Sequence, residues 1–396
     1  MKLPRFAILL ALAIAGATIS AGSAYASPGS HHRDRGHYDP TGHPASFVVG
    51  HAYVDDNTAL SNTVAGFARH ADGSLTPILG SPFSIGGAGT GAGLPSQGAI
   101  QLSSDGRYLL AVDAKSNQIS VLRLGFDGVA QLVGSPMASG GSEPLSIAVS
   151  GNLVYVANSG SEPNVTGFLL SPNGTLNPLP GSTVSLPAGS GPDDVLFDPR
   201  GHKLVVDLDN TSSIASFRVR HDGLLVAAPG SPLAGQGLGP FGAEFRPTNP
   251  SQLFVSNAHN LGASSGTVSA FLVAGSGQLA PIGASPFADL QTAPCWVEIS
   301  HDGQFLFTVN TGSGEISSYS INPDGSLVLL GSTPFGSAGA GAVDARLSPD
   351  GKTLLVDGSK AGVIASFAVT GGSLTELASS PTALPAGAFA AGIVTD

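Results

Sequence analysis

The stretch Ser348-Pro349-Asp350-Gly351-Lys352-Thr353-Leu354-Leu355-Val356-Asp357 decides the fold of this 396-residue chain. Its Asp-Gly pair predicts a tight hairpin turn, because glycine accepts a positive φ and aspartate can bond its own backbone. The apolar run that follows predicts a strand that is buried on both faces. Related stretches begin at Ser104-Asp105-Gly106 and at Ser300-His301-Asp302-Gly303, so the signature recurs along the chain.

A second kind of turn lies between these signatures and gives the period of the repeat. Its glycines, 46 to 55 residues apart, are Gly73, Gly128, Gly174, Gly223, Gly277, Gly325 and Gly372. Two turns per repeat, with β-branched and apolar runs between them, predict four strands in each repeat. Seven such units predict an all-β fold, a seven-bladed β-propeller of four-stranded blades, with a solenoid as the alternative.

The two ends of the repeat array predict how the ring closes. The first repeat, from Phe47, lacks its own first strand, and the C-terminal stretch 388–395 has the pattern of an orphan strand. We expect this C-terminal strand to be the innermost strand of the first blade. Closure in this way leaves no open sheet edge at the join, so a monomer is expected.

Residues 1–26 have the pattern of a secretory signal peptide. Lys2 and Arg5 precede an apolar run, and Ala24-Tyr25-Ala26 is the small-x-small pattern of a cleavage site. The alternative is an N-terminal membrane anchor, but the run is shorter than the roughly 20 residues that a span needs. No later segment is long and apolar enough to span a membrane, so the sequence predicts a secreted or periplasmic protein.

Residues 27–45 separate the predicted signal from the predicted propeller, which covers 46–396. This arm is rich in histidine, with His31, His32, His37 and His43. We expect a disordered, solvated tail. A weak metal-binding arm is the alternative.

Composition excludes several classes of function. Charged residues make up 11% of the chain and the net charge is −11, whereas nucleic acid requires basic patches. The single cysteine, Cys295, cannot form an internal disulfide, so packing must stabilise the fold. No motif ties a histidine or aspartate to Cys295, which favours a structural cysteine over a nucleophile.

An alignment of the innermost strands shows an unusually polar register. It holds Gln101, Ala148, Leu196, Glu244, Glu298 and Arg346, and Ala99, Ser146, Asp194, Gly242, Trp296 and Asp344 stand two positions earlier. Buried strands rarely carry glutamate and arginine without a partner. If this register faces the central channel, Glu244, Glu298 and Arg346 form either a site or an ion pair that holds blades together.

The loops after the second strands add further polar groups, which a ring of seven blades places on one rim. They are Asp55, Asp56, Asp113, Asn158, Asp207, Asp209, Asn257, His259, Asn310 and Asp357. Oxygen ligands of this kind can bind Ca²⁺. A solvated rim is the alternative, and no spacing matches a metal loop, so no cofactor is predicted and Ca²⁺ is left open.

The repeat motifs resemble those of the seven-bladed propeller lactonase family, which includes the propeller type of 6-phosphogluconolactonase and carboxymuconate cyclase. The resemblance rests on Ser348–Asp357 and on Asn322-Pro323-Asp324-Gly325-Ser326-Leu327, and it covers about 46–396. It implies opening or closing of a lactone ring, which needs a base and charge stabilisation.

One blade departs from the pattern that the resemblance implies. In the family, a mid-chain inner strand typically begins Gly-Pro-Arg-His, and a glutamate follows in the next loop. Here the matching residues are Gly191-Pro192-Asp193-Asp194, and Asp209 stands for the glutamate. These charge reversals mean that the family's mechanism does not transfer intact.

Two functional hypotheses follow. The first is an exported lactonase-like enzyme that hydrolyses a lactone or related ester in the central channel. The second is a non-catalytic propeller that binds a carbohydrate, a peptide or a protein partner on its loop face. The candidate catalytic residues are Asp194, Asp209, Glu244, Glu298 and Arg346, and the candidate substrate-binding residues are Asp193, Trp296, Asp344 and Asn310.

Overall fold

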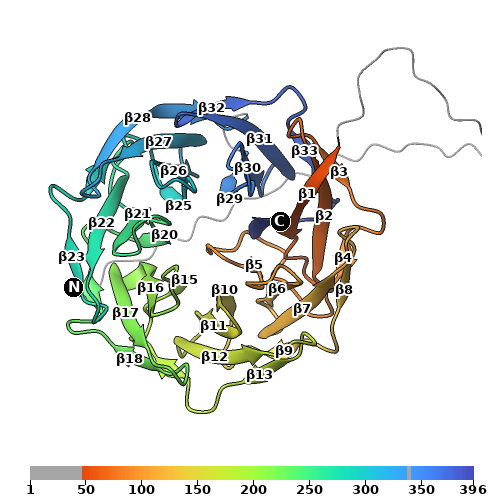
Figure 1. Ribbon diagram of the computed structural model, residues 1–396, viewed down its shortest axis with the longest axis horizontal. Coiled ribbons are helices and arrows are strands. Elements are labelled where there is room, and N and C mark those ends of the chain that lie inside the picture. The colour runs from red at the N-terminus through yellow and green to blue at the C-terminus, as the bar shows by residue number, and fades with distance from the viewer. Residues whose placement is uncertain (1–46, 337–339) are drawn as a thin grey trace, which may run out of the picture. The chain divides into compact units, whose positions relative to one another are not determined.

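A computed structural model describes residues 47–336 and 340–396 of the chain, and the propeller unit spans Ser46–Asp396. The predicted signal peptide and histidine-rich arm lie outside the described residues. The described part forms seven β-sheets, which Figure 1 shows arranged as blades around a ring. This confirms the predicted seven-bladed propeller and excludes the solenoid.

The strands of each blade run in order from the centre outwards (Figure 1). The innermost strands of blades 1 to 7 are β34 (Gly392–Thr395), β5 (Ile100–Leu102), β10 (Pro144–Ser150), β15 (Pro192–Phe197), β20 (Pro240–Phe245), β25 (Pro294–Ile299) and β29 (Ala342–Leu347). The second strands are β1 (Val48–Asp55), β6 (Tyr108–Asp113), β11 (Leu153–Asn158), β16 (Lys203–Leu208), β21 (Gln252–Asn257), β26 (Phe305–Asn310) and β30 (Thr353–Gly358).

The outer half of each blade repeats in the same way. The third strands are β2 (Thr63–His70), β7 (Gln118–Leu124), β12 (Asn164–Leu170), β17 (Ser213–Val219), β22 (Thr267–Val273), β27 (Glu315–Ile321) and β31 (Val363–Thr370). The outer strands are β3 (Leu75–Pro77), β8 (Ala130–Leu132), β13 (Leu176–Pro178), β18 (Leu225–Ala227), β23 (Leu279–Pro281), β28 (Leu327–Pro334) and β32 (Ser373–Glu376). A two-residue strand also pairs with the third strand in six blades, as β4 (Phe83–Ser84), β9 (Met137–Ala138), β14 (Val184–Ser185), β19 (Leu233–Ala234), β24 (Phe287–Ala288) and β33 (Thr382–Ala383).

Blade 6 differs at its outer edge, where β28 runs unbroken for eight residues. In blades 1, 2 and 4 the outer strand stops before a Gly-Ser-Pro sequence, such as Gly80-Ser81-Pro82, and the chain then adds a short strand. Blade 6 has Gly331-Ser332-Thr333-Pro334 instead, with one residue more before the proline. The strand passes this point with a register shift opposite Ser318 and Tyr319 and continues to pair with β27.

The C-terminal strand closes the ring as predicted. β34 pairs antiparallel with β1, from Ala52 opposite Thr395 to Asp55 opposite Gly392. Beyond this pairing, His51 Nδ1 lies 3.0 Å from a carboxylate oxygen of Asp396, and the Arg69 guanidinium donates to the Asp396 carbonyl oxygen at 2.7 Å. The first and last strands are therefore joined by backbone pairing and by side chains.

The hairpin turns have the geometry that their sequences predict. Gly73 and Gly351 have φ values of 81° and 69°. The Ser74 backbone N–H donates to Asp72 Oδ1 at 3.0 Å, and that of Lys352 donates to Asp350 Oδ1 at 3.2 Å. All of these Asp-Gly turns leave the blades on one face of the ring, which we call the turn face. The opposite face carries the entries to the inner strands and the loops between second and third strands, and we call it the loop face.

Apolar side chains fill the space between neighbouring blades. Between blades 6 and 7, for example, Phe307 and Ile316 share a buried cluster with Leu354, Val356 and Phe367. Burying a side chain of this size contributes about 1.5–3 kcal/mol. This packing explains how a chain without an internal disulfide holds seven sheets together.

Within the described residues, none of the helical structure is long and apolar enough to be a membrane span. In this described part the helical content is a single 3₁₀ turn, η1 (Asp209–Thr211), on the loop face of blade 4. Its first residue is one of the predicted site residues.

Candidate functional site

Side chains on the inner strands bond to the backbone of the next blade around the ring. Asp194 accepts from the Ala243 N–H at 3.0 Å, Glu298 from the Leu347 N–H at 2.8 Å, and Asp344 from the Ile393 N–H at 3.2 Å. Ser146 and Glu244 accept in the same way from the N–H groups of Val195 and Ile299, at 3.1 and 2.5 Å. The polar register that the sequence shows is therefore a set of links between neighbouring inner strands.

A glutamine crosses the channel where this register has no side chain to offer. Gly242 cannot supply an acceptor, and Gln97 Oε1 accepts from the Val297 N–H at 3.0 Å in its place. Gln97 Nε2 donates to the Ala243 carbonyl oxygen at 3.0 Å, and the Gln97 backbone N–H donates to the Asp193 carbonyl oxygen at 3.2 Å. The loop between blades 1 and 2 thus spans the channel and contacts blades 4, 5 and 6.

Glu244, Glu298 and Arg346 lie at the penultimate positions of their strands, toward the turn face. Arg346 Nη1 lies 3.3 Å from Glu298 Oε2, with 26% of the arginine side chain exposed and 5% of the glutamate. Burial raises the pKa of Glu244 and of Glu298, and the Arg346 guanidinium opposes both shifts. Burial alone would lower the pKa of Arg346, but Glu298, Asp344, Glu244 and Asp194 raise it. The guanidinium therefore stays charged among several carboxyl groups.

A second group of predicted residues lies at the loop face of blade 4. Asp193 is the second residue of β15, Asp207 lies opposite Asp194 near the end of β16, and Asp209 begins η1. His259, in the loop after β21 of blade 5, places Nδ1 3.0 Å from Asp209 Oδ1. We call Asp193, Asp207, Asp209 and His259 the loop-face group.

Glycine allows the two blades to approach at this point. Gly239 precedes β20 with a φ of 64°, and a Cβ there would lie 2.7 Å from Asp209 Oδ1 and 2.8 Å from His259 Cβ. The His259 backbone N–H donates to the Leu238 carbonyl oxygen at 2.9 Å, which fixes the histidine beside the same strand entry. The Asp209–His259 contact therefore depends on the absence of a side chain at Gly239.

The carboxyl groups of the loop-face group differ in exposure and charge. Asp193 and Asp207 are buried, and all four of their carboxyl oxygens lack a hydrogen-bond partner. Burial raises the pKa of both well above the usual range, and the neighbouring aspartates raise it further. Burial also raises the pKa of Asp209, but His259 opposes this shift. Burial and the neighbouring aspartates thus favour the neutral forms of Asp193 and Asp207, and Asp209 is the member of the group that has His259 beside it.

Asp194 stands next to this group but belongs to the links between inner strands. Its two oxygens accept from Ser146 Oγ at 3.2 Å and from the Ala243 N–H. Burial raises its pKa to about 8, while these two hydrogen bonds lower it. The structure thus separates Asp193 and Asp209 from Asp194, Glu244, Glu298, Asp344 and Arg346.

The remaining candidates are buried within and beside blade 6. Trp296 is 4% exposed, donates its indole N–H to the Ser96 carbonyl oxygen at 2.7 Å, and packs edge-on against Phe241. Asn310 is fully buried and donates to Ser317 Oγ at 2.9 Å. Burial raises the pKa of the Cys295 thiol to about 12, so this thiol is not an activated nucleophile. The faces of the Trp296 ring are covered in this structure.

The acidic rim does not assemble a metal centre within the described residues. No three histidine, cysteine, aspartate or glutamate side chains in this part of the chain come together as metal ligands. Several rim carboxylates instead have local partners, as when Asp55 Oδ1 accepts from the Asn62 amide at 3.0 Å and Asp113 Oδ2 from Ser120 Oγ at 2.6 Å.

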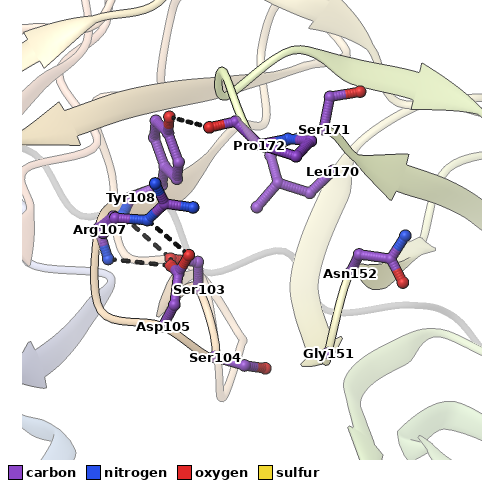
Figure 2. Close-up of a pocket in the computed structure, with 10 residues that line it drawn as sticks. All are labelled: Ser103, Ser104, Asp105, Arg107, Tyr108, Gly151, Asn152, Leu170, Ser171 and Pro172. Atoms are coloured by element: carbon purple, nitrogen blue, oxygen red, sulfur yellow. Dashed lines mark hydrogen bonds and ion pairs between the residues drawn. The ribbon is translucent and has the colours of Figure 1, made fainter.

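A separate groove of about 330 Å³ lies on the turn face, between blades 2 and 3 (Figure 2). Arg107 and Asp105 pair with each other in it at 2.6 Å, and the Tyr108 hydroxyl donates to the Pro172 carbonyl oxygen at 2.9 Å. Because its polar side chains bond to one another, the groove presents no activated group.

Sequence reasoning placed His259 on the rim but not in the site, and it missed Gln97. His259 and Asp209 belong to different repeats, and only the ring brings them together. The signal for Gln97 was indirect, since Gly242 is a glycine in a register where other blades carry Ser146, Asp194 or Asp344.

Comparisons with known proteins identify the family. The sequence model of the family "Lactonase, 7-bladed beta-propeller" matches residues 50–190 and 245–388. The stretch between these matches contains blade 4 and most of β20, and so includes Asp193, Asp207 and Asp209. No curated protein sequence matches the chain.

Solved structures with the same fold include two bacterial lactonase-like proteins. The periplasmic gluconolactonase PpgL of Pseudomonas aeruginosa has a TM-score of 0.69 and 18% identity, over 87% of this chain and 98% of that one. A candidate 6-phosphogluconolactonase of Bacteroides uniformis has a TM-score of 0.69 and 20% identity, over 88% of this chain and 99% of that one. At these identities the likeness shows the fold, and the family match shows the kinship. This chain belongs to the lactonase family of seven-bladed β-propellers.

Proposed function

We propose that the chain hydrolyses a lactone or a related ester at the loop-face group. The observation that carries this proposal is the contact of 3.0 Å between Asp209 and His259. The histidine side chain is 56% exposed and that of the aspartate 15%, so the pair is open to a ligand on one side and backed by protein on the other. A histidine held by a carboxylate is a common general base.

The proposed reaction uses this pair to activate water. Asp209 Oδ1 lies 3.0 Å from His259 Nδ1 but accepts no hydrogen bond in this structure. The proposed reaction therefore begins with a small rotation of the exposed His259 ring, which lets Nδ1–H donate to Asp209 and leaves Nε2 to accept a proton. Water attacks the lactone carbonyl carbon as His259 takes its proton, and the tetrahedral intermediate forms. The ring C–O bond then breaks, and the leaving alkoxide takes the proton from His259, which gives a hydroxy acid.

Asp193 and Asp207 support the pair without contacting the substrate. Burial raises the pKa of both and so favours their neutral forms, which reduces the negative charge close to Asp209. This arrangement replaces the arginine and histidine that the family pattern places at 193 and 194. The competing function is a non-catalytic propeller that binds a ligand. No contact in the loop-face group favours simple binding over catalysis by the Asp209–His259 pair.

The proposal includes export of the protein, and this part rests only on the sequence pattern of residues 1–26. The signal peptide that the sequence predicts would bring the enzyme to an extracytoplasmic lactone.

Turnover by the purified full chain tests the proposal. Hydrolysis of a lactone panel is followed by acid release in a pH-stat, for wild type and for Asp209→Asn and His259→Gln. We expect each substitution to lower kcat/KM by about 100-fold or more. His301→Gln is the matched control, because His301 is exposed in a turn on the opposite face. Absence of turnover by wild type, or full activity in His259→Gln, would refute the proposal.

A further inference from the structure

We infer that the substrate of the loop-face group is an uncharged lactone that carries an apolar chain, rather than a phosphorylated or otherwise anionic sugar lactone. This inference rests on the proposed function and specifies its substrate class. Two independent features of the loop face carry it: the distribution of charge around His259, and three exposed leucines beside it.

The loops around His259 contain no lysine or arginine. These loops connect the strands of blades 4, 5 and 6, and they are 186–191, 209–212, 235–239, 258–266, 289–293 and 311–314. A site for a phosphate or carboxylate needs cationic donors, because an anion that leaves water must be paired. The acidic side chains in these loops or within two residues of them are Asp193, Asp207, Asp209, Asp289 and Glu315, and of these Asp209 lies 3.0 Å from His259. An anionic ligand would meet only carboxyl groups there.

The cations of the loop face lie on the far side of the ring. Lys115 follows β6 of blade 2 and Lys360 follows β30 of blade 7. These two blades flank blade 1, whereas blades 4 and 5 stand across the ring from it (Figure 1). Neither lysine is therefore placed to pair with a ligand held at His259.

Three exposed leucines lie in the loops next to the histidine, on the same face. Leu238, whose carbonyl oxygen accepts from the His259 N–H, is 47% exposed, and Leu261, two residues after His259, is 87% exposed. Leu290, at the entry to blade 6, is 60% exposed, and the Ser264 N–H donates to Thr292 Oγ1 at 2.9 Å, which joins the loop of Leu261 to that entry. Exposed apolar side chains that gather beside polar groups mark ligand sites.

Together these features predict how rate depends on the substrate. Each methylene that packs fully on the leucines raises kcat/KM by up to about fourfold, and partial packing gives less. A phosphate or carboxylate on the substrate lowers it, because the neighbouring carboxyl groups cannot pair with an anion.

Kinetics on a graded substrate series test the inference. The series is γ-butyrolactone, γ-hexanolactone, γ-octanolactone and γ-decanolactone, with glucono-1,5-lactone and its 6-phosphate as polar members. For wild type we expect kcat/KM to rise with chain length and to be lowest for the phosphate. Leu261→Ser and Leu290→Ser should flatten this rise, so that the loss of kcat/KM grows from γ-butyrolactone to γ-decanolactone.

Leu60→Ser is the matched control, since Leu60 is 96% exposed on the loop face of blade 1, across the ring. It should leave the whole series unchanged. Preference for the phosphate, or a chain-length dependence that Leu261→Ser does not alter, would overturn the inference while hydrolysis itself stands.

A binding measurement distinguishes failure of the proposed function from failure of the inference about the substrate. If no lactone turns over, the proposed function fails, and calorimetric titration with γ-decanolactone then decides the inference. Binding that Leu261→Ser weakens and Leu60→Ser does not would support an apolar site. Absence of binding would overturn it.

Discussion

The side-chain amide of Gln97 occupies the space that a Cβ on Gly242 would need. One residue comes from the loop between blades 1 and 2, and the other from the inner strand of blade 5. Their fit lets a single glutamine satisfy the Val297 N–H and the Ala243 carbonyl oxygen across the channel.

Gly242→Ala should destabilise the propeller by about 1–3 kcal/mol, because the new methyl group also meets the Cys295 carbonyl oxygen and forces Gln97 aside. The midpoint of urea unfolding measures this loss. Gly275→Ala serves as the control, since a Cβ there meets nothing within 4 Å. Equal midpoints for the two variants would show that the crossing contributes no stability.

Asp396→Asn should weaken ring closure in a pH-dependent way. Burial alone would raise the pKa of Asp396, but hydrogen bonds and charge from His51, with the charge of Arg69, lower it below its usual value. A carboxyl group with a lowered pKa in the folded state stabilises that state above its unfolded pKa of about 3.9, and this contribution disappears as the pH falls through the folded pKa.

Unfolding midpoints between pH 2.5 and 7 should therefore separate wild type from Asp396→Asn at the upper end and bring them together at the lower end. The gap should be about 1 kcal/mol or less, because the side chain is partly exposed. Glu162→Gln, an exposed carboxyl group, should match wild type throughout. A constant gap at all pH values would contradict the role of the Asp396 charge.

Asp357→Asn should reduce the loss of folding stability that the wild type shows as the pH rises from 5 to 8. Asp357 is fully buried, and burial raises its pKa well above the usual value. The folded state holds this proton more tightly than the unfolded state, so stability falls as the pH rises above about 4. Both carboxyl oxygens lack a partner, so a neutral amide can replace the neutral acid. Asp324→Asn, in an exposed turn, should keep the wild-type slope.

Arg346→Met should destabilise the protein by about 2 kcal/mol without lowering kcat/KM of the folded fraction. It leaves Glu298 buried without its cation, and the partial exposure of Arg346 keeps the cost at the lower end for such pairs. The double variant Glu298→Gln/Arg346→Met should recover part of the loss. If Arg346→Met instead lowered kcat/KM and left the stability unchanged, Glu298 and Arg346 would be part of the catalytic site.

The sequence predicts the blades better than the site. The blades depend on residues that are close together in the chain, whereas the site depends on contacts between residues that are far apart in it. Asp-Gly turns and apolar runs are local, so seven repeats and a closing strand within 388–395 follow from them, although the strand itself begins only at Gly392. Asp193 and Asp209 lie within one repeat, and the family pattern singled them out. His259 joins them from the next blade, and Gln97 comes from a loop without an equivalent in the other repeats. Such contacts depend on the ring geometry, which no local pattern contains.

Blade 1 takes three of its four principal strands from the first residues of the propeller and the fourth from 392–395. A chain is made from its N-terminus onward, so this blade is both the first to begin and the last to finish. Until synthesis is complete, β1 keeps a free edge that another strand can occupy. A polypeptide that stops a few residues early therefore loses more than a tail, because it remains an open arc.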